Sequence, residues 1–141
     1  MNPHIFREYD IRGRVPDELN PVTVHRLGLS FGTYYQKHGA SKITLGRDCR
    51  LSSPELRDSL SRGLLEAGVD ILDVGMVPTP LLYFSLHHFD VDGGIQITGS
   101  HNPPEYNGFK ISLGKATIYG QEIQEIRKIA EAGEFHNGTG K

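Results

Sequence analysis

The densest group of reactive side chains in the sequence lies in the segment Thr98–Pro104, T-G-S-H-N-P-P. An apolar run precedes it, so we expect a strand to end here and a loop to begin. Gly99 permits a sharp turn, and two consecutive prolines stiffen the exit. Such a loop holds the hydroxyl of Ser100, the imidazole of His101 and the amide of Asn102 in place, as catalysis requires. A plain turn fits the same residues equally well.

Ser100 does not match the nucleophile of a serine hydrolase. The strand-turn-helix motif of α/β-hydrolases has a glycine two residues after the serine, where this chain has Asn102. Adjacent side chains such as those of Ser100 and His101 seldom meet in a nucleophile–base hydrogen bond. The prolines also prevent an immediate helix whose N-terminus would stabilise an anion. The sequence therefore disfavours acyl transfer.

The cationic side chains favour phosphate chemistry instead. Three arginines crowd the N-terminal segment, two follow the first clear strand, and a lysine lies ten residues after the serine. Arginine binds phosphate oxygens bidentately, and lysine supplies a point charge or a proton. Any one of them alone is more simply a solvated surface charge, so this interpretation depends on their convergence. The residues are Arg7, Arg12, Arg14, Arg47, Arg50 and Lys110.

Hydrophobic periodicity and turn residues place these side chains on alternating strands and helices. We expect helices over residues 20–39, from 52 or 53 to 68, over 79–88 and over 121–132. We expect strands over 42–46, 70–75, 93–99, 107–113 and 115–119. Asn20 is the expected cap of the first helix and Gly39 its left-handed end. Ser52 and Glu55 have the spacing of a capping box for the second helix.

Strand, helix, strand, helix, strand is the order that crossover connections produce. It predicts an α/β fold, a three-layer α/β/α domain with a mixed, mostly parallel sheet covered by helices. Ligands bind beyond the carboxyl ends of such strands. The loops after the first three strands should therefore meet at one edge, which would bring Arg47, Pro78 and Ser100 together.

Length and composition limit the classes of function. The chain has 141 residues, enough for one domain, and a net charge of −2, so we expect no nucleic-acid partner and no membrane partner. Cys49 is the only cysteine and no secretory signal begins the chain, which together indicate a cytoplasmic protein. We expect residues 1–134 to form the domain. Residues 135–141 are polar and glycine-rich, typical of an interdomain linker or a frayed end.

Two further patterns resemble sites without meeting their requirements. The segment Gly138–Lys141 ends like a P-loop, but no glycine occupies position 135 and no strand precedes it. His87 and His88, followed by Asp90 and Asp92, resemble metal ligands. Histidines in the last turn of a helix are favoured there by the helix dipole, which is the simpler interpretation.

Three motifs, in order and at matching spacing, resemble the α-D-phosphohexomutase family, particularly its bacterial phosphomannomutase/phosphoglucomutase branch. The resemblance spans nearly the whole chain but corresponds only to the family's N-terminal domain. Gly99 in place of alanine fits this branch better than the glucosamine branch. The motifs are Phe6–Gly13, Gly46–Arg50 with Ser53–Glu55, and Thr98–Pro103 with Tyr106–Ile111.

The resemblance implies a phosphoryl-transfer mechanism centred on Ser100. The serine would be phosphorylated, pass its phosphoryl group to a hexose phosphate substrate, and recover a phosphoryl group from a hexose 1,6-bisphosphate intermediate. Lys110 would act as general acid/base, Arg12 and His101 would support it, and Tyr9 would line the cleft. Arg12 and Lys110 would also bind substrate. Mg²⁺ would bind an oxygen of the phosphoserine.

One departure from the family concerns length. Family members are several times longer, and their acidic metal loop, sugar-recognition loop and distal phosphate-binding domain have no counterpart here. No D-x-D-x-D cluster occurs in the sequence. We therefore expect the remaining domains of the same enzyme to be required partners and this chain alone to lack mutase activity. The alternative is a stand-alone module that binds phosphosugars or a protein without catalysis.

Overall fold

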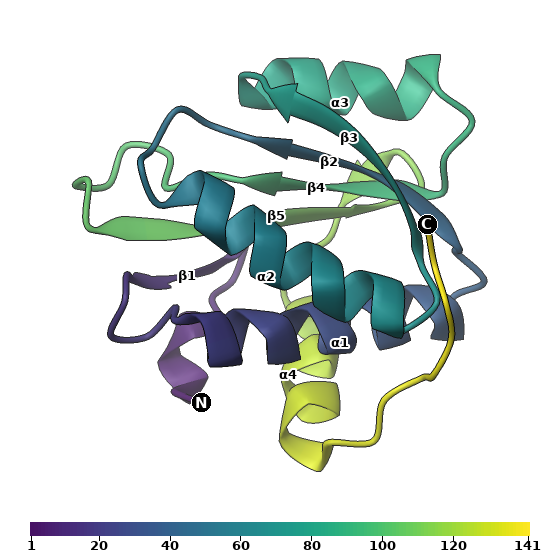
Figure 1. Ribbon diagram of the computed structural model, residues 1–141, viewed down its shortest axis with the longest axis horizontal. Coiled ribbons are helices and arrows are strands. Elements are labelled where there is room, and N and C mark those ends of the chain that lie inside the picture. Colours follow the sequence, from purple (N-terminus) through teal and green to yellow (C-terminus); the bar gives the residue numbers. More distant parts are fainter.

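Helices and strands alternate along most of the chain in the computed structural model, which describes residues 1–141 (Figure 1). A short 3₁₀ helix over Pro3–Ile5 precedes the first strand. The α-helices are α1 (Pro21–Lys37), α2 (Ser53–Glu66), α3 (Thr79–His88) and α4 (Gln121–Ala132). The strands are β1 (Ile11–Arg14), β2 (Lys42–Arg47), β3 (Asp70–Met76), β4 (Gly93–Ile97), β5 (Tyr106–Leu113) and β6 (Ala116–Thr117).

The six strands form one mixed sheet in the order β1-β5-β4-β2-β3, with β6 paired to β5. Strand β2 pairs in parallel with both β3 and β4. Strand β5 pairs antiparallel with β4, β1 and β6. Only β5 therefore runs against the other strands, which confirms a mixed, mostly parallel sheet.

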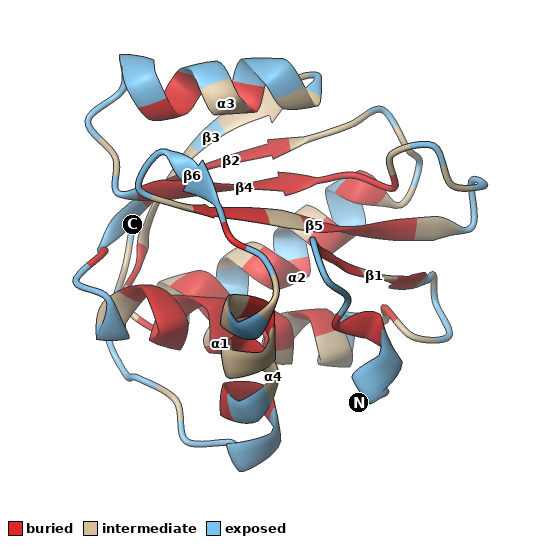
Figure 2. Ribbon diagram, turned by 180° about the vertical axis from the view of Figure 1, so that it is seen from behind, coloured by how far each residue is buried: buried red, intermediate tan, exposed pale blue.

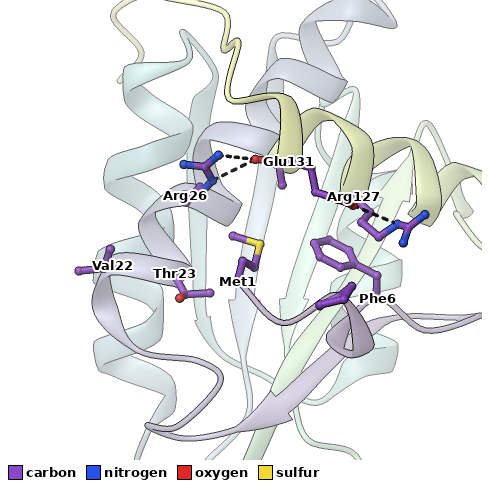
Figure 3. A pocket seen from close by; sticks show the side chains of 9 residues that line it. Met1, Phe6, Val22, Thr23, Arg26, Arg127 and Glu131 are labelled. Atoms are coloured by element: carbon purple, nitrogen blue, oxygen red, sulfur yellow. Dashed lines mark hydrogen bonds and ion pairs between the residues drawn. The ribbon is translucent and has the colours of Figure 1, made fainter.

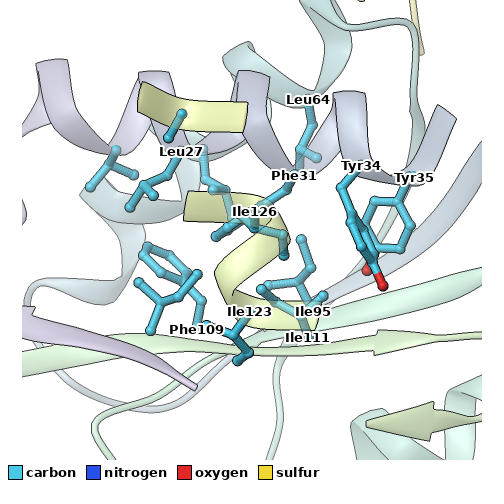
Figure 4. Close-up of a cluster of buried hydrophobic side chains, with 14 of the residues drawn as sticks. Leu27, Phe31, Tyr34, Tyr35, Leu64, Ile95, Phe109, Ile111, Ile123 and Ile126 are labelled. Atoms are coloured by element: carbon cyan, nitrogen blue, oxygen red, sulfur yellow. The ribbon is translucent and has the colours of Figure 1, made fainter. Parts of the chain in front are cut away.

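Helices cover both faces of this sheet. Helix α3 lies on one face, whereas α1, α2 and α4 lie on the other (Figures 1 and 2). A cluster of 25 buried residues fills the space on the second side, and its side chains come from the helices and the sheet alike (Figure 4). Phe31 of α1 and Phe109 of β5 meet edge to face, with centroids 5.7 Å apart. The three-layer α/β/α arrangement is confirmed. None of the helices has both the length and the apolar character needed to cross a membrane.

Glycines let α1 and α2 approach each other closely. A Cβ atom built on Gly28 of α1 would lie 2.4 Å from the carbonyl oxygen of Leu60. One built on Gly63 of α2 would lie 2.3 Å from the carbonyl oxygen of His25. Neither position has room for a side chain, so the two backbones pack directly against each other.

The helix ends agree only in part with the sequence. The side chain of Asn20 accepts a hydrogen bond from the N–H of Thr23 at 2.9 Å, and Gly39 has a left-handed φ of +74°, both as expected. The capping box predicted for α2 is wrong, because Ser52 makes no capping bond. The hydroxyl of Ser53 instead donates to a carboxylate oxygen of Asp48 at 2.7 Å.

The C-terminal segment, residues 135–141, is extended and bound along the edge of the domain, beside β3 (Figure 1). The N–H groups of Gly138 and Gly140 donate to carbonyl oxygens of α2, and the N–H of Ile71 donates to the carbonyl oxygen of Lys141 at 2.8 Å. These backbone bonds hold the segment against the domain, and the predicted domain boundary after residue 134 stays a prediction. A role as an interdomain linker stays a prediction.

Candidate active site

Ser100 lies in the turn between β4 and β5. Its φ is +52°, and it is the only residue other than glycine with a positive φ. This conformation costs a non-glycine residue about 1–3 kcal/mol and is concentrated at functional sites. The N–H of Ser100 donates to the Thr98 hydroxyl at 3.0 Å, and the N–H of Asn102 donates to the carbonyl oxygen of Gly99 at 3.0 Å. The loop thus holds the serine in a conformation that the residue alone disfavours.

Arg12 reaches the serine from β1, which places it beside the loop by pairing Arg12 with Gly108 of β5. Its Nη2 atom lies 3.3 Å from Ser100 Oγ, and its Nη1 donates to Asn102 Oδ1 at 2.6 Å. The guanidinium also pairs with the carboxylate of Asp10. Its Nε is buried and has no hydrogen-bond partner. A cation is therefore fixed within reach of any negative charge that develops at Ser100.

An open cleft of about 810 Å³ begins at this loop and extends toward α3. Phe109 and Ile111 belong to the core, so Lys110 between them points to the opposite face of β5, the face that carries α3. Lys110 lines the cleft together with Ser100 and His101. Thr79, at the N-terminus of α3, lies at its rim, where the helix dipole favours an anion.

Asp48 joins the loop after β2 to the serine loop. Its Oδ2 accepts from the N–H of Gly99 at 3.2 Å, and its Oδ1 accepts from the Ser53 hydroxyl. Burial opposes ionisation of Asp48, but hydrogen bonds from Ser53, the backbone of Arg50, Thr98 and the backbone of Gly99 outweigh it, so its pKa is lowered. The carboxylate is thus ionised at neutral pH and acts as an anchor for the loop.

We expect Asp48→Asn to destabilise the chain by about 1–3 kcal/mol at neutral pH, because the new amide N–H₂ faces a donor. The folded-state pKa is depressed, so the stabilisation by Asp48 is complete above the unfolded pKa of about 3.9 and disappears as pH falls through the folded value. Urea unfolding at neutral pH and below about pH 3 measures the free energy of unfolding of both chains. The wild type should be the more stable at neutral pH and should lose this difference in acid. Exposed Asp17→Asn is the control, and an advantage that persists in acid contradicts the account.

Some predicted site residues lie elsewhere. Pro78 and Ser100 line the same cleft, as expected, but Arg47 does not, because its guanidinium pairs with Asp73 of β3 at 3.6 Å. Arg14 is 4.0 Å from Asp17 on the surface, and Arg7 is exposed. The expected convergence of cations therefore holds only for Arg12, Arg50 and Lys110.

The two remaining predicted residues differ in position. His101 is exposed and lines the cleft, with no hydrogen bond to the chain. Tyr9 is 70% exposed and does not line the cleft. Its ring lies 6.2 Å from that of Tyr119, centroid to centroid. The His101 side chain is thus accessible from the cleft, whereas Tyr9 lies outside it.

A second cavity, of about 560 Å³, lies between the N-terminal segment, α1 and α4 (Figure 3). Its two arginines already bind within the chain. Arg26 donates from Nε and Nη2 to the carbonyl oxygen of Ala130 at 3.0 and 2.6 Å, and Arg127 pairs with Glu131 at 3.4 Å. This cavity shares no residue with the cleft at Ser100.

The chain does not by itself form a magnesium site. No three side chains of His, Cys, Asp or Glu lie close enough together to hold a metal ion. The carboxylate nearest the serine loop, that of Asp48, already accepts hydrogen bonds from Gly99, Ser53 and Arg50. One phosphoserine oxygen would supply one ligand, whereas Mg²⁺ requires octahedral coordination.

Comparison with protein families matches residues 3–137 to the description "Phosphoglucomutase/phosphomannomutase, alpha/beta/alpha domain I". A phosphomannomutase/phosphoglucomutase of Pseudomonas aeruginosa is 43% identical over 136 residues, covering 96% of this chain and 29% of that protein. A phosphoglucomutase of Neisseria gonorrhoeae is 46% identical over 131 residues, covering 93% of this chain and 28% of that protein. The chain thus spans less than a third of the length of these relatives.

Solved structures agree in fold. A phosphoglucomutase/phosphomannomutase family protein from Burkholderia thailandensis superposes with a TM-score of 0.95 at 42% identity, over 100% of this chain and 32% of that one. A protein described as a phosphomannomutase from Thermus thermophilus superposes with a TM-score of 0.84 at 30% identity, over 96% of this chain and 31% of that one. The domain therefore recurs as one part of larger proteins.

Proposed function

This chain belongs to the phosphoglucomutase/phosphomannomutase family, whose domain I it matches, and we propose that its Ser100 carries the phosphoryl group exchanged with a hexose phosphate. One observation carries the proposal. Ser100 has a left-handed backbone conformation in the turn after β4, and its Oγ lies 3.3 Å from an Arg12 guanidinium that other bonds hold in place. Phosphoryl transfer depends mainly on positioned charge, which this arrangement supplies.

The proposed reaction divides one transfer into two steps. A hydroxyl oxygen of the hexose monophosphate attacks phosphoserine 100, so a new P–O bond to the sugar forms and the P–O bond to Ser100 Oγ breaks. The sugar hydroxyl loses its proton, and Ser100 Oγ gains one. After the bisphosphorylated sugar reorients, Ser100 Oγ attacks its other phosphate, so a P–O bond to Oγ forms and the P–O bond to the sugar breaks. Ser100 Oγ loses its proton and the sugar oxygen gains one, which restores the phosphoserine and releases the isomer.

Four residues, in or near the cleft, have a proposed role in these steps. Arg12 binds the phosphoryl oxygens as charge moves between serine and sugar. Lys110 donates the proton to Ser100 Oγ and takes it back, and His101, exposed beside the serine, supports the transfer. Tyr9 contacts the sugar from the N-terminal segment, which also carries the Asp10–Arg12 pair.

The rest of the site must come from outside this chain. The family resemblance implies Mg²⁺, which neutralises charge in phosphoryl transfer, but the residues present do not form its site. We propose that other domains of the same enzyme provide the metal ligands and the second phosphate site, since the chain covers only 29% of its Pseudomonas aeruginosa relative.

Turnover of hexose 1-phosphates by the complete polypeptide that carries this domain tests the proposal, with the 141-residue chain assayed in parallel. Conversion to the 6-phosphate by the complete polypeptide, and none by the chain alone, is expected. Binding of hexose phosphate without conversion by the complete polypeptide would show instead a non-catalytic phosphosugar-binding protein.

Lys110→Ala should lower turnover by the complete polypeptide about 10²–10⁴-fold, the usual contribution of a general acid/base. Its effect on the free energy of unfolding should stay below about 1 kcal/mol, because the half-buried side chain faces the cleft and not the core. Steady-state kinetics and urea unfolding measure the two effects, with exposed Lys115→Ala as the control. A variant that simply unfolds would identify Lys110 as a structural residue.

A further inference from the structure

The guanidinium of Arg50 lies against the serine loop and binds its backbone from within. Nη2 donates to the carbonyl oxygens of Ser100 at 2.9 Å and Asn102 at 2.7 Å. Nη1 donates to those of Pro103 at 2.7 Å and Tyr106 at 3.1 Å. One side chain from the loop after β2 thus binds three carbonyl groups of the loop that carries the serine and a fourth at the start of β5.

These bonds use the whole donor capacity of the side chain. The remaining donor, Nε, bonds to Asp48 Oδ2 at 3.2 Å, and the side chain is only 14% exposed. A guanidinium has five N–H groups, so none is left for a substrate phosphate. The expectation that Arg50 helps to hold phosphate is therefore wrong, because its guanidinium binds the serine loop and Asp48 instead.

Arg50 supports a part of the loop that has few backbone donors of its own. Its two consecutive prolines, Pro103 and Pro104, have no N–H to donate. A Cβ atom built on Gly99 would lie 2.4 Å from Arg50 Cζ, so the guanidinium packs directly against this glycine. Asp48 in turn ties Arg50 and the N–H of Gly99 to the start of α2 through Ser53. Loop, guanidinium and helix form one bonded unit.

We propose that Arg50 is a positioning residue that holds Ser100 in its left-handed conformation and so controls the rate of phosphoryl transfer. This role rests on the proposed function of Ser100. Arg50 binds the carbonyl oxygen of the strained residue, Ser100, directly. It also binds the carbonyl oxygen of Asn102, whose side chain accepts a hydrogen bond from Arg12. Loss of these bonds lets the serine relax and moves its Oγ away from Arg12.

Arg50→Lys tests this role, because lysine keeps the charge but cannot span four carbonyl groups. In the complete polypeptide we expect kcat to fall about 10²-fold or more, with KM changed by less than about 3-fold, the result of misplacing the nucleophile. Arg57→Lys is the control, since the Arg57 guanidinium also bonds within the chain, to the carboxylates of Asp58 and Asp73, but lies outside the cleft. A raised KM with unchanged kcat would show that Arg50 binds substrate, and would overturn the proposal.

Amide hydrogen exchange on the 141-residue chain, which has its own buried core, tests the loop separately from any mutase activity. In Arg50→Lys the amides from Gly99 to Tyr106 should exchange about 10-fold faster or more, while those of β4 stay unchanged. Unchanged loop exchange overturns the proposal, whereas a complete polypeptide without turnover overturns only the function of Ser100. If Arg50→Lys does not fold, Asp48→Asn serves instead, because Asp48 holds Arg50 and the N–H of Gly99. Unchanged loop exchange and unchanged kcat in Asp48→Asn would overturn the proposal.

Discussion

Ser100→Ala is expected to abolish hexose-phosphate turnover by the complete polypeptide, at least about 10⁴-fold, because no other residue replaces a lost nucleophile. The fold should be unaffected. The Ser100 hydroxyl is part-buried, makes one long contact with Arg12 at 3.3 Å, and belongs to no core cluster. We therefore expect the free energy of unfolding of this chain to change by less than about 1 kcal/mol. Turnover and urea unfolding are measured on the same variant.

Ser41→Ala is the matched control for that experiment. Ser41 is exposed, and only its backbone bonds: its N–H donates to Asp92, and its carbonyl oxygen accepts from the N–H of Asp70. Turnover by this variant should equal that of the wild type. Wild-type turnover by Ser100→Ala, in contrast, would remove Ser100 from the mechanism.

Gly63→Ala is expected to destabilise the chain by about 2–4 kcal/mol through overpacking. In an uncrowded helix the same substitution stabilises by about 1 kcal/mol, because alanine has the higher helix propensity. Here the new methyl group would lie 2.3 Å from the carbonyl oxygen of His25 and 2.7 Å from the N–H nitrogen of Leu29. Both contacts are with the backbone of α1, so the helices must separate. Chemical denaturation measures the loss.

Arg62→Ala is the control, because it introduces alanine at an exposed position of the same helix, where the new side chain meets no neighbouring backbone. Its stability should stay within about 0.5 kcal/mol of wild type. A Gly63→Ala chain as stable as the wild type would show that α1 and α2 do not pack in direct backbone contact.

Much of the fold could be predicted from the sequence because the signals are local. The cap at Asn20, the left-handed Gly39 and the alternation of strands with helices all depend on neighbouring residues, and the structure confirms them. Strand β1 was not predicted. Its sequence, I-R-G-R, has one apolar residue, and it becomes a strand by pairing with β5, where Ile11 meets Phe109.

The contact between α1 and α2 was also not predicted, although both helices were. Apolar periodicity identifies Leu27, Phe31, Leu60 and Leu64, which face the core. Apolar periodicity does not identify Gly63, because a glycine that allows two helices to approach closely adds no apolar side chain to the pattern.

The sequence predicts the reactive residues of the site but not the long-range hydrogen bonds that position them. Ser100, Arg12 and Lys110 belong to motifs, whereas the role of Arg50 depends on carbonyl groups 50–56 residues further along the chain. The direction of the Arg47 side chain, in contrast, could have been predicted from strand periodicity. Ile43 and Leu45 face the core, so Arg47 lies on the same face and meets Asp73 instead of the serine.

The most direct test of the central claim is to locate the phosphate on the protein. The complete polypeptide is incubated with hexose 1,6-bisphosphate carrying labelled phosphate, and the labelled peptide is then mapped by mass spectrometry. We predict one phosphate, on Ser100, that passes to added hexose monophosphate and is absent from Ser100→Ala. Label on a different residue, or turnover of hexose phosphate without any phosphorylated protein, would contradict it.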